Sequence, residues 1–127
     1  MNLSVLPQKL AVLKLDPNQS IPEWALNHKE FTSITYTGEE LSIVCLQDDV
    51  PAEVEGIETS LDWQGIKVEG PLDFSLTGIL SSLAAPLAEA EISIFALSTY
   101  DTDYLLVKAD TLKDAIHVLT EQGHNVN

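Results

Sequence analysis

The chain has 127 residues and a hydrophobic fraction of 45%, which is enough apolar material for a packed core and excludes a disordered chain. Twenty acidic residues against six basic ones give a formal net charge of −14. Such a surface repels phosphate groups, so we expect neither nucleic acid nor a membrane as a partner. No apolar run approaches the ~18 residues that cross a bilayer. The N-terminal residues lack the pattern of a signal peptide, so we expect a cytoplasmic protein.

All the basic residues are lysines, and the absence of arginine limits how the chain can hold an anion. Without a bidentate guanidinium, an anionic ligand group must be bound by backbone N–H groups, by a helix N-terminus or by lysine. The single cysteine, Cys45, lies in the apolar run of residues 41–46, and we interpret it as a buried, unreactive thiol. A disulfide within the chain is excluded.

Apolar segments in the first half of the chain are separated by turn residues. We expect a short helix over residues 20–26, capped by Ser20 and with Pro22 in its first turn. Residues 52–60 are acidic and predict either a short helix or a loop. Three segments predict strands, the last two joined as a hairpin by Gly38 and Glu39: residues 9–15, 31–37 and 41–46.

The second half begins near Trp63 and has a clearer pattern. We expect a helix over residues 77–90, in which Pro86 removes one backbone hydrogen bond. A closing helix starts at Thr111, which forms a capping-box pattern with Asp114, and ends at Gly123. The predicted strands of this half are residues 64–70, 92–97 and 104–108, with a last short one at residues 125–126.

The two helices of the second half each carry an apolar stripe at helical spacing. The predicted stripe residues are Ile79, Leu80, Leu83 and Leu87 in the first helix and Leu112, Ala115, Ile116 and Leu119 in the second. The strand at 92–97 is apolar on both faces, with Ile92, Ile94 and Ala96 expected to face the helices. Phe95 and Leu97 then need another cover, which either a second subunit or the other half of the chain provides.

The order of elements is similar in the two halves, although their sequences are not. The second half is predicted as β-α-β-β-α, and the first as β, short helix, β-β and an uncertain second helix. This order predicts an α+β fold of two split βαβ units with antiparallel sheets and helices on one face. We place the first, abbreviated unit at residues 1–60 and the second at residues 61–127.

Catalytic and metal-binding patterns are absent from the sequence. The three histidines have no zinc-ligand spacing, and no glycine-rich phosphate loop or nucleophile motif occurs. We therefore predict no catalytic residue, no bound metal and no cofactor. Carboxylate pairs such as Asp48 with Asp49 leave a small enzyme using acid–base chemistry as an alternative.

Residues 85–107 carry a resemblance to a known family. Their Pro-Leu-Ala-Glu turn at 86–89, the Leu-Ser-Thr-Tyr stretch at 97–100 and the pair Asp103-Tyr104 resemble the ACT-domain subfamily that includes the CASTOR arginine sensors and uncharacterised bacterial proteins. Residues 70–78 are similar to the strand-to-helix loop of that family. The resemblance implies tandem ACT-like, βαββαβ ferredoxin-like units that bind an amino acid or a similar small molecule at an interface between ACT units, in a homodimer.

The resemblance and the local chemistry together define a candidate ligand site. Backbone N–H groups near the start of the helix suit a carboxylate, Gly78 allows close approach, and Asp103 or Asp73 suits an ammonium or guanidinium group. The alternative is that Gly78 only eases packing and Asp103 only shapes a hairpin. The candidate ligand-binding residues are Leu72, Asp73, Phe74, Ser75, Thr77, Gly78, Ser98, Thr99, Asp101 and Asp103.

Three functions follow from these expectations. The first is a small regulatory or sensor protein that binds a small ligand such as an amino acid, with a cationic amino acid as one option. The second is a structural module that pairs with other proteins and binds no ligand. The third is the small enzyme.

Overall fold

The computed structural model describes residues 1–70 and 77–127, which form two compact units. Unit 1 comprises residues 1–7 and 64–127, and unit 2 comprises residues 8–63. The strands are β1 (Asn2–Leu15), β2 (Ser33–Tyr36), β3 (Leu41–Leu46), β4 (Glu58–Val68), β5 (Phe95–Ser98), β6 (Asp103–Lys108) and β7 (Asn125–Val126). The helices are α1 (Ile79–Glu89) and α2 (Leu112–Glu121), with short 3-10 turns at Glu23–Leu26, Gln47–Asp49 and Ala109–Thr111.

Both boundaries between the units fall inside a strand. β1 and β4 each contribute one end to unit 1 and the other end to unit 2. The first seven residues therefore belong with the second half of the chain. These two units therefore differ from the predicted division into residues 1–60 and 61–127, because residues 1–7 group with unit 1. The assignment of two tandem ACT-like units stays a prediction.

Unit 2 is built on four strands in the order β2-β3-β1-β4. β1 and β3 are antiparallel, with Leu10 opposite Leu46 and Leu15 opposite Leu41, and β2 adds to the other side of β3. Because side chains alternate along a strand, Leu13, Ile43 and Cys45 share one face, where they are buried in a common core.

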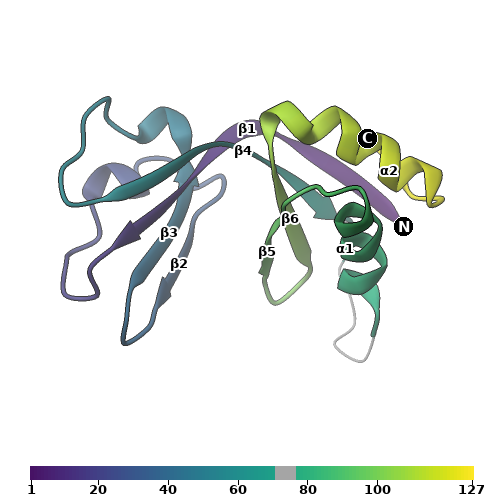
Figure 1. Cartoon of the computed structure of the whole chain (residues 1–127). Helices are drawn as coiled ribbons and strands as arrows, with labels where there is room; N and C mark the ends of the chain where they lie inside the picture. Colours follow the sequence, from purple (N-terminus) through teal and green to yellow (C-terminus); the bar gives the residue numbers. More distant parts are fainter. Residues whose placement is uncertain (71–76) are drawn as a thin grey trace. The chain divides into compact units, whose positions relative to one another are not determined.

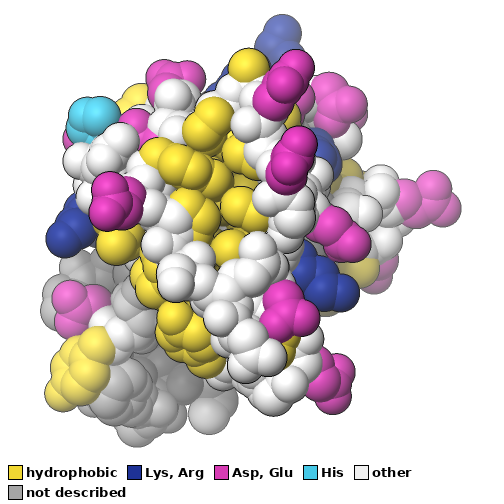
Figure 2. All heavy atoms as spheres, turned by 90° about the vertical axis from the view of Figure 1, so that its left-hand side faces the viewer, with side chains coloured by type: hydrophobic (Ala, Val, Ile, Leu, Met, Phe, Trp, Pro, Cys, Tyr) yellow, Lys and Arg dark blue, Asp and Glu magenta, His cyan; other side chains and the backbone are white. Residues whose placement is uncertain are grey.

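The 3-10 turn Glu23–Leu26 packs on this core in unit 2. Ala25 of that turn is buried in the core, and Trp24 packs beside it. The expected cap does not form, because the turn begins at Glu23 and the preceding residue, Pro22, offers no side-chain hydrogen bond. Figure 2 views the side on which unit 2 lies and shows apolar side chains gathered in the middle, with acidic side chains around them.

The uncertain stretch between the two halves is resolved in favour of a loop and a strand. Residues 50–57 form no helix, and β4 begins at Glu58 rather than at residue 64 as expected. Residues 58–63 include acidic residues at 58 and 62 and show no alternation of apolar and polar residues. This part of the strand could therefore not be predicted from the sequence.

Unit 1 contains the order that the second half of the sequence predicts. Its strands pair as β7-β1-β4-β6-β5, with β7 parallel to the start of β1 and β5 antiparallel to β6. α1 connects β4 to β5, and α2 connects β6 to β7. Figure 1 shows both helices on one face of this sheet, so the α+β class with helices on one face is confirmed.

The helix stripes are confirmed in part. Leu83 and Leu87 of α1 and Leu119 of α2 are fully buried against Ile66 and Leu105 of the sheet. The prediction was wrong for two stripe residues. Leu80 is 37% exposed, and Ile116 is half-buried, whereas Val118 packs against the core instead.

The ends of α2 are stabilised differently from one another. Gly123 takes a φ of 90° after the last turn, and the N–H of His124 donates to the C=O of Leu119 at 3.1 Å, which is the Schellman arrangement predicted by the glycine. The capping box at the other end was wrong. The Thr111 side chain makes no hydrogen bond to the N–H groups of the first turn, and its hydroxyl donates instead to the C=O of Lys108.

The predicted strand at 92–97 starts later than expected. Ile92 is buried in the unit 1 core and Ile94 packs against it, as predicted, but both precede β5. Ala96 is exposed, contrary to the prediction that it faces the helices, while Phe95 and Leu97 are half-buried. Part of the Phe95 and Leu97 side chains therefore stays exposed, and whether a second subunit covers them remains a prediction.

Candidate functional site

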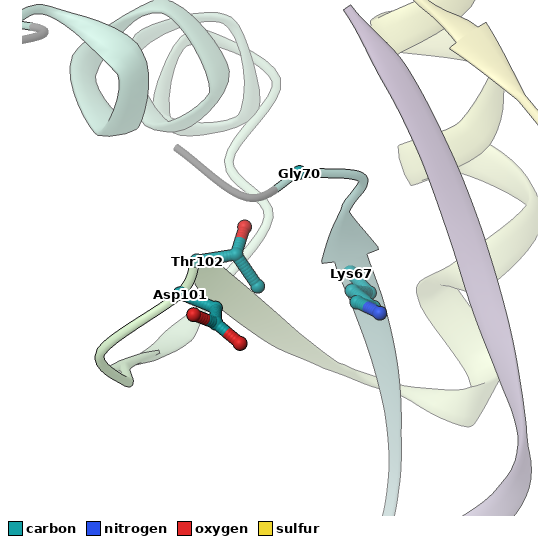
Figure 3. Close-up of a pocket in the computed structure, with 4 residues that line it drawn as sticks. All are labelled: Lys67, Gly70, Asp101 and Thr102. Carbon is teal, nitrogen blue, oxygen red and sulfur yellow. The ribbon is translucent and has the colours of Figure 1, made fainter. Parts of the chain in front are cut away.

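A polar pocket lies in unit 1 at the end of β4, beside the point where the chain leaves the strand toward α1. It has a volume of about 160 Å³ and is lined by Lys67, Gly70, Asp101 and Thr102. Figure 3 shows Lys67 on β4, Gly70 just beyond the end of that strand, and Asp101 and Thr102 in the turn that leads into β6. The pocket therefore brings together two turns that are far apart in sequence.

Alternation along β4 places Lys67 at this pocket. Ile66 and Val68 are buried in the core beneath the helices, so Lys67 between them projects from the opposite face of the strand. Its Nζ lies 3.8 Å from a carboxylate oxygen of Glu69. This partly exposed ion pair contributes little to stability and leaves the ammonium accessible.

Thr102 fixes the turn that carries Asp101. The Thr102 side chain is buried, and its hydroxyl donates a hydrogen bond of 2.5 Å to the C=O of Val68 at the end of β4. Thr99 closes the turn from the other side, because its N–H donates to the C=O of Thr102 at 2.8 Å. Asp101 lies between these two anchors and its side chain is exposed at the pocket, where it forms no ion pair in the described part of the chain.

The predicted site residues fall into four groups, of which the last, Thr77 and Gly78, lies just before α1. Asp101 lines the pocket. Ser98, Thr99 and Asp103 belong to the hairpin itself, where the Ser98 hydroxyl donates to the Asp103 carboxylate at 2.6 Å. Leu72, Asp73, Phe74 and Ser75 lie outside the described residues.

Thr77 and Gly78 precede α1, and both are exposed. Gly78 occupies the N-cap position with a φ of 76°, which is the left-handed region. Its C=O accepts hydrogen bonds from the N–H of Ser82 and from the Ser81 hydroxyl. The glycine is therefore required by backbone conformation, in addition to any part in ligand approach.

Three pocket residues were missed by the sequence-based prediction. Lys67 lies on the strand before the loop of residues 70–78, Gly70 is the first residue of that loop but was not among the candidate ligand-binding residues, and Thr102 lies between two predicted residues. A signal for Lys67 was present, because a chain without arginine must use lysine or backbone groups to hold an anion. Thr102 gave no signal, because its role depends on a contact with residue 68, far away in sequence.

Other reactive groups lie apart from this pocket. Burial, with a smaller contribution from the charge of Asp49, raises the pKa of the Cys45 thiol to about 11, so the thiol stays protonated and unreactive at neutral pH. Within residues 1–70 and 77–127 there is no group of three acidic, histidine or cysteine side chains that could hold a metal ion. In the same residues no helix is long and apolar enough to cross a membrane.

The architecture of unit 1 defines a split βαβ domain of the α+β class, with a polar pocket at a strand-to-helix connection. A family model for the ACT domain matches residues 58–121. The chain belongs to the ACT domain family. A second family model, described as an N-terminal domain, matches residues 8–53.

Two human proteins are similar in sequence. CASTOR3P is 32% identical over 103 residues, covering 73% of this chain and 63% of that protein. The cytosolic arginine sensor for mTORC1 subunit 1 is 40% identical over 58 residues, covering 45% of this chain and 18% of the sensor. The chain thus spans less than two thirds of the length of these relatives.

Solved structures extend the similarity to the whole chain. Protein Atu0741 from Agrobacterium tumefaciens has a TM-score of 0.89 at 36% identity, covering 99% of this chain and 91% of that one. The regulatory subunit of aspartate kinase from Thermus flavus has a TM-score of 0.68 at 10% identity and covers 97% of both chains. The second comparison shows a shared fold.

Proposed function

We propose that this protein is a regulatory ACT-domain protein that binds an amino acid in the pocket formed by Lys67, Gly70, Asp101 and Thr102. The observation that carries the proposal is the presence of one cationic and one anionic side chain in the same pocket of unit 1, beside the connection to α1. Membership of the ACT family and similarity to a protein named as an arginine sensor support a ligand-binding role.

The charges of the pocket match those of a free α-amino acid. The α-carboxylate would contact the Lys67 ammonium and the α-ammonium would contact the Asp101 carboxylate. The sequence alone had favoured backbone N–H groups as the carboxylate partner and Asp103 as the ammonium partner. Asp101 is now the better candidate, because one oxygen of Asp103 already accepts the hydrogen bond of Ser98.

Calorimetric titration with a panel of the common amino acids, including arginine, tests this proposal. We expect one amino acid to bind, and we expect Asp101→Asn or Lys67→Met to weaken binding about ten- to a hundredfold, because each removes a charge-assisted contact. Asp103→Asn should have a smaller effect. Asp110→Asn and Lys113→Met change exposed residues of unit 1 outside the pocket and serve as matched controls. No binding across the panel would refute the amino-acid proposal.

The second candidate function is a structural module that pairs with other proteins and binds no ligand. Apolar side chains exposed on the edge strand β2, Ile34 and Tyr36, favour it. This function would be supported if no amino acid shifted the melting temperature of the protein while the protein still associated with itself or with a partner. Turnover of a bound ligand would instead favour an enzyme, for which no described arrangement of side chains gives a specific mechanism.

The same proposal includes a homodimer in the cytoplasm that works without a cofactor. Dimer formation would supply the second side of a ligand site of the kind that forms at interfaces between ACT units.

A further inference from the structure

The free edge of β2 is a surface of unit 2 with a chemistry of its own. β2 is the last strand in the order β2-β3-β1-β4-β6-β5, and among the described residues it pairs only with β3. Charged residues and proline usually protect a free edge from pairing, and Ser33–Tyr36 contain neither. The surface shares no residue with the unit 1 pocket, so it can be tested independently of the proposed amino-acid site.

The backbone hydrogen bonds of the β2–β3 hairpin show which groups point outward. The N–H of Thr37 donates to the C=O of Glu40 at 2.9 Å, so these two residues form a hydrogen-bonded pair. Hydrogen-bonded and non-hydrogen-bonded pairs alternate along an antiparallel ladder. In the register of this hairpin, every second residue of β2, beginning with Ser33, therefore bonds to β3. The N–H and C=O groups of Ile34 and Tyr36 point the other way, toward the free edge.

The same two residues present apolar side chains at the edge. Ile34 is 37% exposed and Tyr36 is 58% exposed. They lie opposite Ile43 and Leu41, on the sheet face that carries the unit 2 core. A strand added at this edge would place every second side chain beside Ile34 and Tyr36. The edge thus offers both the backbone groups and the side-chain contacts that strand addition uses.

Carboxylates stand at both ends of β2. Glu30 precedes the strand, and Glu39 and Glu40 follow it in the hairpin turn. The Thr37 hydroxyl oxygen accepts hydrogen bonds from the N–H of Glu39 at 3.2 Å and from the N–H of Glu40 at 3.1 Å, which orders this turn. Among the described residues, none of the three carboxylates forms an ion pair within 4.0 Å. Unit 2 holds eleven acidic residues and three lysines, so its field favours a basic partner.

We propose that the free edge of β2 binds an extended basic segment of another protein, which adds to the sheet as a further strand. The backbone of the segment pairs with Ile34 and Tyr36, and its apolar side chains pack beside theirs. Lysine or arginine side chains at its two ends contact Glu30 and Glu39. A second copy of this chain fits less well. Antiparallel pairing of two β2 strands would bring Glu30 of one copy beside Glu39 and Glu40 of the other, and like charges oppose such pairing.

The test uses the full chain and the amidated peptide Lys-Lys-Val-Thr-Val-Thr-Lys-Lys. One matched peptide has Glu in place of every Lys. The other is N-methylated at both Val residues, which removes the N–H groups that would bond to the edge. We expect the basic peptide to bind at least about tenfold more tightly than either matched peptide at about 0.05 M salt. Its advantage over the acidic peptide should shrink at about 0.5 M salt, because salt screens the charges.

Amide hydrogen exchange followed by NMR locates the bound peptide. Saturating basic peptide should slow exchange at Ile34 and Tyr36 by at least about tenfold, because their N–H groups become bonded. Ser33 and Thr35 should change little, because their N–H groups already bond to β3.

Variants of the chain separate strand addition from diffuse attraction to an acidic protein. Glu30→Gln combined with Glu39→Gln should weaken binding of the basic peptide about fivefold, because two exposed charge contacts are lost. Glu89→Gln combined with Asp110→Asn neutralises two exposed carboxylates of unit 1 and should have no such effect. Tyr36→Thr keeps a strand-forming residue and should weaken binding through the loss of apolar contact.

Three results would overturn the proposal. The first is that no peptide slows exchange at Ile34 and Tyr36, and the second is that the basic and N-methylated peptides bind equally. The third is that exchange at these two residues slows when the concentration of the protein alone is raised, which would show that a second copy occupies the edge. Asp101→Asn should leave peptide binding unchanged, so failure of the amino-acid proposal and failure of this one are distinguishable.

Discussion

At the scale of single residues, the pair of His28 and Asp49 in unit 2 stands apart from the rest of an exposed acidic surface. The Asp49 side chain is only 8% exposed, and one of its oxygens accepts a 2.7 Å hydrogen bond from Nδ1 of His28. The other oxygen, Oδ2, is buried without a hydrogen-bond partner in the described structure. The histidine therefore supplies the main compensation for burying this carboxylate.

This pair predicts a pH dependence of stability. The hydrogen bond to Asp49, and then the charge of Asp49, raise the pKa of His28 above its usual 6.5. A raised folded-state pKa means that the stabilisation is fully present below the unfolded pKa and is lost as the pH rises through the folded value. We expect the stability advantage of the wild type over Asp49→Asn, measured by urea denaturation, to be larger near about pH 5.5 than near about pH 8.5.

An NMR titration of the imidazole provides the direct check. Asp49→Asn should lower the pKa of His28, while the resonances of His117 and His124 in unit 1 serve as internal references. A His28 titration that does not change in the variant would show that the pair is not formed in solution.

The glycine before α1 allows a second prediction at this scale. Gly78 has a φ of 76°, and among the described residues a Cβ there would meet only Ser81 Oγ at 3.9 Å, so substitution introduces backbone strain. Gly78→Ala should reduce the free energy of unfolding by about 1–2 kcal/mol. Gly38→Ala is the matched control, because a Cβ added there would meet nothing within 4 Å and Gly38 has no positive φ. Equal urea midpoints for the two variants would contradict the prediction.

At the scale of elements, the two faces of α1 differ enough for a matched comparison. Leu83 is fully buried, whereas Leu80, three residues earlier, is 37% exposed. Leu83→Asp places an unpaired charge in the unit 1 core, which costs at least several kcal/mol and approaches the stability of a whole domain. Leu80→Asp leaves its charge in water.

We therefore expect Leu83→Asp to be unfolded by circular dichroism and Leu80→Asp to melt cooperatively near the wild-type temperature. On α2, Leu119→Asp should behave like Leu83→Asp, because Leu119 is also fully buried. A folded Leu83→Asp protein would mean that α1 does not pack on the sheet through this face.

The edge strand β2 is a further feature at this scale. Its four residues, Ser33–Tyr36, contain no charged side chain and no proline. Free strand edges usually carry charged residues or proline, because these residues discourage pairing with another chain. Ile34 and Tyr36 are 37% and 58% exposed, so the edge of unit 2 offers both backbone groups and apolar surface to another chain.

At the scale of the whole molecule, self-association must overcome the repulsion between copies that each carry a net charge of −14. We expect a homodimer at micromolar concentration that is favoured by raising the salt concentration from about 0.05 M to about 0.5 M, because salt screens this repulsion. Sedimentation velocity at the two salt concentrations measures it.

Variants of β2 locate the interface. Tyr36→Asp should weaken the dimer if the edge of unit 2 is used, with Thr35→Asp as the control on the opposite face of the same strand. Monomer at every concentration and salt level would contradict the dimer, and would leave the half-buried Phe95 and Leu97 without a second subunit as their cover.

The sequence by itself determined the class of fold and most elements of unit 1. Helical spacing of leucines identified α1 and α2, Gly123 identified the end of α2, and alternation of apolar residues identified the strands. These signals are local, because each depends on residues within one or two turns of one another. The same locality explains the errors at Leu80 and Ile116, since spacing defines a stripe but not how far the neighbouring elements extend over it.

Only the tertiary structure decided which residues form the candidate site. Lys67 lies on β4 and Asp101 lies in the turn before β6, and both line one pocket because the Thr102 hydroxyl donates a hydrogen bond to the C=O of Val68 at the end of β4. The physical reason is that a pocket depends on contacts between residues distant in the chain, and side-chain periodicity carries no information about those contacts.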